Sequence, residues 1–94
     1  MTEGALTPDC RPRLAPHVRL RFDAVRARQV LLGPERVLMP DETALAVLLL
    51  CDGERSLATI AADLAARYQA PPEVVAADIA EMLQDLVDKG LVLA

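Results

Sequence analysis

The segment over residues 72–90 constrains the fold of this chain more than any other. Pro72 suits the first turn of an α-helix, and Lys89 with Gly90 supplies the cation and the left-handed residue that end one. At about 100° per residue, its apolar side chains cover an arc of roughly 160°, wider than the ~100° stripe that packs on one neighbour. The helix is therefore either wedged between its neighbours or lines a groove with one edge of the arc. The arc comprises Val75, Ala76, Ile79, Ala80, Met82, Leu83, Leu86 and Val87.

Two shorter helices precede this segment. Asp41 is a suitable N-cap for a helix over residues 41–52, which Asp52 and Gly53 end, with Gly53 suited to the left-handed position. Ser56 caps a second helix over residues 56–68, whose apolar side chains fall on one stripe. The sequence therefore predicts three consecutive helices joined by short turns.

Upstream of the helices, the sequence predicts short strands. Residues 17–22 alternate between apolar and polar side chains, a second run covers residues 28–32, and a Gly-Pro turn leads into a third run over residues 35–39. This third run contains three consecutive apolar residues, Val37, Leu38 and Met39. Because a strand with one face in solvent alternates, we expect something to cover the second face here. Residues 91–93 either form a short last strand or pack on the core.

Together these elements predict an α+β, winged-helix-like fold, in which three short N-terminal antiparallel strands are followed by a three-helix bundle. The single domain covers residues 17–94. Residues 1–16 contain three prolines, which remove backbone donors, and predict a flexible, proline-rich N-terminal arm. Exchange of this arm between two subunits, giving a homodimer, is an alternative that the sequence leaves open.

The charge distribution argues against nucleic acid as a ligand. Residues 1–40 contain seven arginines and four acidic residues, a net charge of +3, whereas residues 41–94 contain three basic and ten acidic residues, a net charge of −7. The third helix, placed to read DNA in a winged helix, has five acidic residues and one lysine. A phosphate backbone would repel this surface. A winged-helix DNA-binding regulator therefore stays an alternative only if DNA contacts the arginine-rich strands.

The sequence contains no residue pattern typical of a catalytic, metal or cofactor site. His17 is the only histidine, Cys10 and Cys51 are far apart, and the glycines form no phosphate-binding loop. No apolar run approaches the ~18 residues that span a bilayer, and no signal-peptide pattern begins the chain. We therefore expect a binding protein, not an enzyme, that uses no cofactor, contacts no membrane and acts in the cytoplasm with reduced thiols.

The wide apolar arc and the non-alternating third strand predict a peptide-recognition domain. A groove between these two elements would accept an extended peptide as an added strand. The strand backbone would supply hydrogen bonds, and the edge of the helix would supply side-chain pockets. The sequence does not indicate which edge of the arc faces the peptide.

Four motifs, taken in order, resemble the PqqD family: VRLRFD at 18–23, LLGPERV at 31–37, LLCDGERS at 49–56 and DLVDKGL at 85–91. The resemblance covers residues 14–94 and implies a winged-helix-like module that also recurs as a leader-recognition element in other peptide-modifying pathways. It further implies that the chain binds the precursor peptide PqqA and presents it to PqqE, a radical S-adenosylmethionine enzyme of pyrroloquinoline quinone biosynthesis. That enzyme joins a glutamate and a tyrosine side chain within the peptide.

The resemblance also implies a binding site, because in relatives the leader adds beside the third strand and packs on the third helix. The strand residues would be Arg36, Val37, Leu38 and Met39, and the helix residues would be Val75, Ile79, Met82 and Leu83. Arg28 and Arg36 either attract acidic groups of the precursor or simply face solvent. A second alternative function is a structural or activating accessory subunit of the enzyme, which would not contact the precursor.

Overall fold

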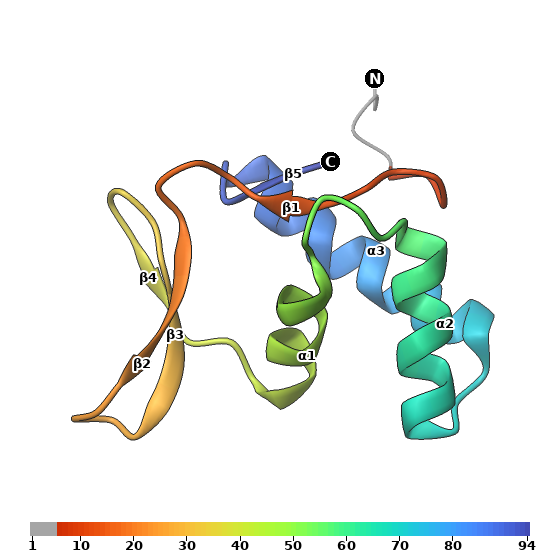
Figure 1. Cartoon of the computed structure of the whole chain (residues 1–94), viewed down its shortest axis with the longest axis horizontal. Helices are drawn as coiled ribbons and strands as arrows, with labels where there is room; N and C mark the ends of the chain where they lie inside the picture. Colours follow the sequence, from red (N-terminus) through yellow and green to blue (C-terminus); the bar gives the residue numbers. More distant parts are fainter. Residues whose placement is uncertain (1–5) are drawn as a thin grey trace.

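The computed structural model of the protein describes residues 6–94, and an antiparallel sheet forms one end of the molecule (Figure 1). Its strands are β2 (Arg19–Asp23), β3 (Arg28–Leu32) and β4 (Val37–Leu38), in the order β2-β3-β4. The third strand is shorter than predicted, since it pairs with β3 over two residues only. The three strands and the helices that follow them confirm the predicted α+β fold.

The helices are α1 (Glu42–Leu50), α2 (Leu57–Tyr68) and α3 (Pro72–Asp88). Both predicted N-caps are confirmed: the Asp41 carboxylate accepts the backbone N–H of Ala44 at 2.8 Å, and the Ser56 hydroxyl accepts that of Thr59 at 3.1 Å. Each cap satisfies a backbone donor that the helix itself leaves free.

The end of α3 follows the predicted glycine signal. Gly90 has φ +77°, its N–H donates to the carbonyl of Val87, and the Leu91 N–H donates to the carbonyl of Leu86. This pair of bonds is the Schellman arrangement, which satisfies carbonyls left open at a helix end. It turns the chain back so that Leu91 enters the core.

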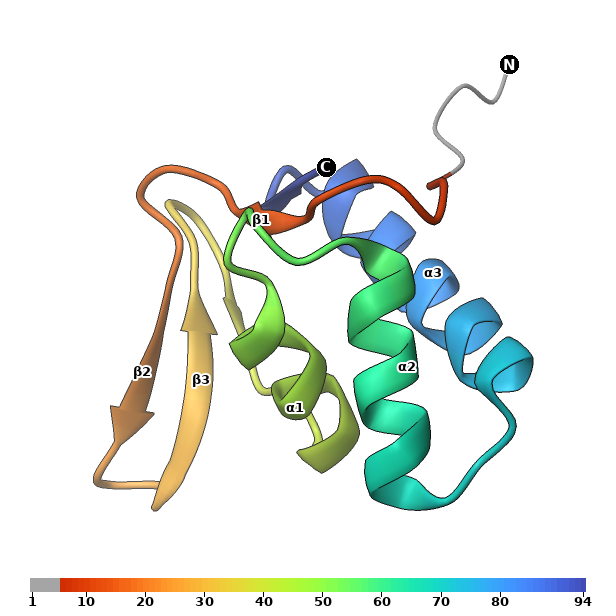
Figure 2. The ribbon, with the colours of Figure 1, turned by 45° about the vertical axis from the view of Figure 1, so that its right-hand side comes forward.

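The core lies where the sheet and the three helices meet. Cross-strand pairing places Leu20, Leu31 and Leu38 in one row, and this row faces the helices because Leu31 is fully buried. Figure 2 shows α1 between the sheet and α2, with α3 beginning on the far side of α2 and running behind it toward β5. The core cluster consists of aliphatic side chains and Cys51, as expected for a chain with two aromatic residues.

The structure differs from the prediction in the segment expected to be a flexible arm. Arg13 and Leu14 form β1, which pairs antiparallel with β5 (Val92–Leu93). We call residues 6–16 the N-terminal strap. Residues 1–5 of the predicted arm lie outside the described residues. The strap belongs to the domain because the backbone of Arg13 and Leu14 pairs with β5, a strand from the other end of the chain. This pairing orders a segment that its prolines alone would leave without regular structure.

The strap also binds the turn before α2 through backbone hydrogen bonds. The carbonyls of Pro8, Cys10 and Pro12 accept the N–H groups of Ala58, Leu57 and Gly53 at 3.0, 2.8 and 3.0 Å. Two of these donors are in the first turn of α2, where a helix cannot satisfy its own N–H groups. The strap therefore completes the N-terminus of α2.

Gly53 has a different role from the predicted one. The helix ends at Leu50 with Cys51 as its cap, so Gly53 lies beyond the left-handed position that follows a helix. Gly53 has φ +80°, and a Cβ there would lie 3.3 Å from Cδ of Arg13. The glycine is therefore needed where the strap crosses the α1–α2 turn, a contact that local sequence does not reveal.

Candidate functional site

The outer edge of β4 is the open edge nearest to the predicted peptide site. Sheet order places β4 at one side, paired with β3 alone among the described residues. The N–H of Gly33 donates to the carbonyl of Arg36 at 2.9 Å, and Leu32 then pairs with Val37. Because hydrogen-bonded and non-hydrogen-bonded pairs alternate in an antiparallel ladder, Val37 does not exchange bonds with Leu32. Its N–H and C=O therefore point to the open edge.

Prolines limit the length of this open edge. Pro34 and Pro40 flank it, and neither has an N–H to donate. The carbonyl of Pro40 already accepts a hydrogen bond from Nη2 of Arg28 at 3.0 Å. A strand added here would therefore pair over about five residues, centred on Val37.

A groove runs beside this edge, between the end of β4, α1 and α3. Its volume is about 290 Å³. Three of the predicted site residues line it: Leu38, Met39 and Met82. The remaining lining residues are Leu31, Pro40, Ala44, Leu48, Asp85, Leu86 and Lys89.

The structure places the other predicted helix residues outside this groove. Ile79 is 4% exposed and Leu83 is 0% exposed, and both belong to the core cluster. Val75 packs against that cluster without lining the groove. Because successive turns of a helix stack at i, i+3 and i+4, the edge that faces β4 contains Met82, Leu86 and Lys89. The other three predicted residues lie on the face turned into the core.

Two predicted strand residues also lie outside the groove. Arg36 is exposed immediately before β4, and Val37 is 56% exposed on the opposite face of the sheet from Leu38. Met39, inside the groove, is still 50% exposed. Large apolar side chains that stay exposed beside an open strand edge are typical of a binding surface.

Sequence reasoning missed the residues that α1 and the end of α3 contribute. Leu86 and Lys89 follow Met82 at helical spacing, so the edge marked by Met82 was the signal that could have identified them. Ala44 and Leu48 had no such signal, because the packing of α1 against the sheet is a tertiary contact. Lys89 forms an ion pair with Asp85 at 2.6 Å at the groove wall, which gives this end a polar character.

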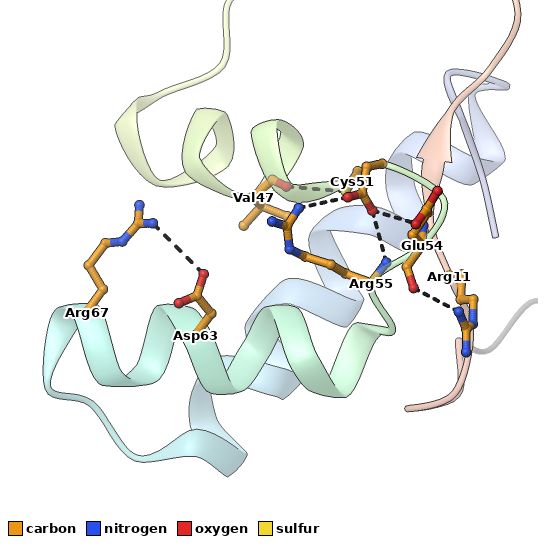
Figure 3. A network of polar contacts seen from close by, with 8 residues as sticks. Arg11, Val47, Cys51, Glu54, Arg55, Asp63 and Arg67 are labelled. Carbon is orange, nitrogen blue, oxygen red and sulfur yellow. Dashed lines mark hydrogen bonds and ion pairs between the residues drawn. The ribbon is translucent and has the colours of Figure 1, made fainter.

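The Asp52-Gly53 motif has a structural role in the turn between α1 and α2, and Figure 3 shows Glu54 and Arg55 of this turn together with Arg11 of the strap. Oδ1 of Asp52 accepts the backbone N–H groups of Glu54 and Arg55, both at 2.9 Å, and Oδ2 binds Nη1 of Arg55 at 2.8 Å. These backbone donors, more than the guanidinium, hold the pKa of Asp52 below its ordinary value. Nη1 of Arg11, from the strap, donates to the carbonyl of Glu54 at 2.9 Å.

The two cysteines are free thiols in this structure. Burial raises the pKa of Cys51 to about 12, and its Sγ donates to the carbonyl of Val47 at 3.3 Å. Burial also raises the pKa of Cys10. A protonated, buried thiol is a poor nucleophile, so Cys51 acts as a packing residue. Within residues 6–94, no group of three or more potential ligands is arranged to hold a metal ion. None of the helices described is both long and apolar enough to cross a bilayer.

A larger cavity, of about 550 Å³, lies between the first turns of α2 and α3 and the strap. Alanines of both helices line it together with Leu6 and Pro8, and it shares no residue with the groove beside β4. It offers no strand edge, so an added strand does not fit there. The smaller groove is therefore the better candidate for an extended peptide.

Comparison with known proteins points to one family. Residues 28–92 match the family described as PqqD, coenzyme PQQ synthesis protein D. A PqqA binding protein from Bradyrhizobium diazoefficiens is 52% identical over 85% of this chain and 78% of its own length. A bifunctional coenzyme PQQ synthesis protein C/D from Methylorubrum extorquens is 49% identical over 83% of this chain, which covers 21% of that longer protein.

A solved structure has the same fold. It is the solution NMR structure of a PqqD truncation of Methylobacterium extorquens PqqCD, described as a functional and stand-alone recognition element for ribosomally synthesized and post-translationally modified peptides. It is 42% identical, covers 100% of both chains and has a TM-score of 0.84.

Proposed function

The chain belongs to the PqqD family, and we propose that it binds the precursor peptide PqqA in the groove beside β4 and presents it to the radical S-adenosylmethionine enzyme PqqE. The family is non-catalytic, and this chain is a binding protein, not an enzyme. The observation that supports the site is the open edge of β4, where the backbone groups of Val37 point outward beside an apolar groove.

In this proposal the peptide adds as a strand to β4. The peptide residue opposite Val37 exchanges two backbone hydrogen bonds with it. Peptide side chains alternate, so every second one enters the groove against Met82 and Leu86, and those between face the other side of the sheet. Each large apolar side chain buried in this way contributes about 1.5–3 kcal/mol, against the cost of ordering the peptide.

A Val37→Pro substitution tests the strand addition. Proline removes the outward N–H, while the β3–β4 ladder does not use that group and is expected to survive. With isotope-labelled wild-type protein, PqqA should shift amide signals over residues 36–39 and along the groove side of α3. With Val37→Pro these shifts should be lost at the same peptide concentration. Val37→Thr keeps the N–H and a similar shape, and should bind nearly as the wild type does.

A second variant protects the test against misfolding. Met82→Glu places a charge at the partly exposed wall of the groove and should weaken PqqA binding without disturbing the core. Dispersed amide spectra show whether each variant is folded. Unchanged PqqA affinity in both folded variants would mean that the peptide binds elsewhere.

The fused relative supports one competing function, an accessory subunit of an enzyme that does not contact PqqA. In Methylorubrum extorquens a segment like this chain is part of a longer bifunctional protein. Complex formation between this chain and PqqE without PqqA, together with no PqqA binding by this chain, would favour that alternative. A cytoplasmic location belongs to the same proposal, and the two free thiols are compatible with it.

A further inference from the structure

The sheet has a second face that carries three arginines around an apolar strip. Cross-strand pairing puts Arg19, Leu32 and Val37 in one row and Arg21 and Val30 in the next. A third row, Asp23 and Arg28, ends this face, and both side chains already have partners, Arg26 for Asp23 and the carbonyl of Pro40 for Arg28. These rows face away from the Leu31 row that packs on the helices. We call the residues of these three rows the outer face. Figures 1 and 2 show the helices on the other side of the sheet.

The outer face is hollowed and apolar at its centre. A depression of about 280 Å³ is lined by Arg21, Val30 and Leu32 together with residues 22–24. Val30 is 4% exposed yet stands outside the core cluster, so its neighbours on this face cover it. An apolar hollow rimmed by polar side chains is the form that a protein-binding surface takes.

Among the described residues, no carboxylate neutralises Arg19 or Arg21. The ion pairs of residues 6–94 join Arg26 to Asp23 and three further pairs on the helices and their turns, and none involves Arg19 or Arg21. Asp23, the nearest acid along β2, is bound by Nη1 of Arg26 at 2.6 Å. The outer face is therefore positively charged in a protein whose net charge is −4.

This face is continuous with the proposed peptide site. Val37 belongs to both, since its backbone points to the open edge and its side chain to the outer face. A peptide strand added at that edge would extend the outer face by one strand, and every second peptide side chain would point the same way as Val37. A protein that contacts this face therefore contacts carrier and peptide together.

We propose that the outer face is the docking surface for the enzyme that modifies the bound peptide, through a surface with carboxylates around an apolar centre. This inference rests on the proposed function. A nucleic acid fits the face less well, because DNA-binding proteins commonly neutralise about six to ten phosphates and this face has three arginines, one of which, Arg28, donates to the carbonyl of Pro40. An acidic protein surface needs only a few cations at the rim, where they raise the association rate.

The test uses the double variant Arg19→Glu/Arg21→Glu with PqqE as the probe. We expect the association rate of the PqqA-loaded protein with PqqE to fall at least about tenfold, and the loss to shrink at high salt. PqqA affinity, measured separately by calorimetry, should stay within about twofold of the wild type, because neither arginine lines the groove. Arg67→Glu, on α2, replaces a similarly exposed arginine and should leave the rate unchanged.

Three outcomes would overturn the docking proposal. The first is an unchanged rate in a double variant that keeps its amide spectrum. The second is a loss caused instead by Asp78→Lys/Glu81→Lys, which would assign docking to the acidic side of α3. The third is no complex between PqqE and the PqqA-loaded wild type. In each case the peptide site stands or falls separately, on the calorimetric affinity for PqqA.

Discussion

Among residues 6–94, three residues other than glycine have positive φ, and two of them occupy positions where glycine is the usual choice. Ala27 closes the β2–β3 turn at φ 54°, and Gln69 ends α2 at φ 54°. His17, at φ 71°, lies where the strap turns into β2. A side chain in this region clashes with its own backbone, at a cost of roughly 1–2 kcal/mol. Glycine at these turns would therefore be expected to stabilise the protein.

Replacing Gln69 with glycine should stabilise the protein. We expect Gln69→Gly to raise the free energy of unfolding by about 1 kcal/mol, because the left-handed conformation no longer strains a side chain. Urea denaturation measures the change. Ala66→Gly, at an exposed position inside the same helix, should lower the same quantity by about 1 kcal/mol. Equal losses in both variants would contradict the strain at Gln69.

The Asp52 carboxylate should make stability depend on pH. Its pKa is lowered in the folded protein, so its contribution is present above the unfolded pKa of about 3.9 and disappears as pH falls through the folded value. The melting temperature of the wild type should therefore exceed that of Asp52→Asn at pH 6, and this gap should narrow and then close as the pH is lowered below the unfolded pKa. A gap of constant size would show that the charge on Asp52 does not contribute.

At the scale of elements, neighbouring residues of α3 lie in two different environments. Leu83 is fully buried in the core, whereas Met82, one position earlier, lines the groove beside β4. Adjacent helix residues point about 100° apart, so residues of one helical turn can face the core and the groove separately. The apolar arc of α3 was predicted from the helical spacing of its residues. This spacing is the same at both edges of the arc, so it does not distinguish them. Only the packing of β4 and α1 decides which edge stays open.

Alanine substitutions on α3 should distinguish these two environments. Leu83→Ala should lower the free energy of unfolding by about 2–5 kcal/mol, because it leaves a cavity in the core. Met82→Ala should cost less than about 1 kcal/mol of stability, but should weaken PqqA binding roughly tenfold through lost apolar contact. Urea denaturation and calorimetric titration measure the two effects. The opposite assignment of the two losses would mean that the core face and the groove face of α3 are exchanged.

At the scale of the whole molecule, the strap joins the two ends of the chain. β1 pairs with β5, and three strap carbonyls satisfy donors at the α1–α2 turn and the start of α2. Pro12, in the middle of this segment, is fully buried. The domain is therefore completed only when the strand at residues 13–14 pairs with the strand at residues 92–93.

Removing residues 1–12 should destabilise the domain. Three backbone hydrogen bonds and the buried Pro12 are lost, which together should lower the free energy of unfolding by roughly 3 kcal/mol at about 1 kcal/mol per bond. Arg11→Ala is the matched control, since it removes a single side-chain bond to Glu54 and should cost less than about 1 kcal/mol. Thermal denaturation of both proteins measures the difference. A truncated domain as stable as Arg11→Ala would show that the strap contributes no stability.

The amino-acid sequence by itself determined the elements of this protein, because strand alternation, N-caps and helix-ending glycines act over a few residues. Asp41, Ser56 and Gly90 are examples that local hydrogen bonds explain. The sequence also identified the strand and the helix between which the groove lies, and three residues that line it. Tertiary structure decided the rest: the pairing of β1 with β5, the core position of Ile79 and Leu83, and the share of α1 in the groove. These depend on contacts between segments far apart in the chain, which local hydrogen bonds and periodicity do not specify.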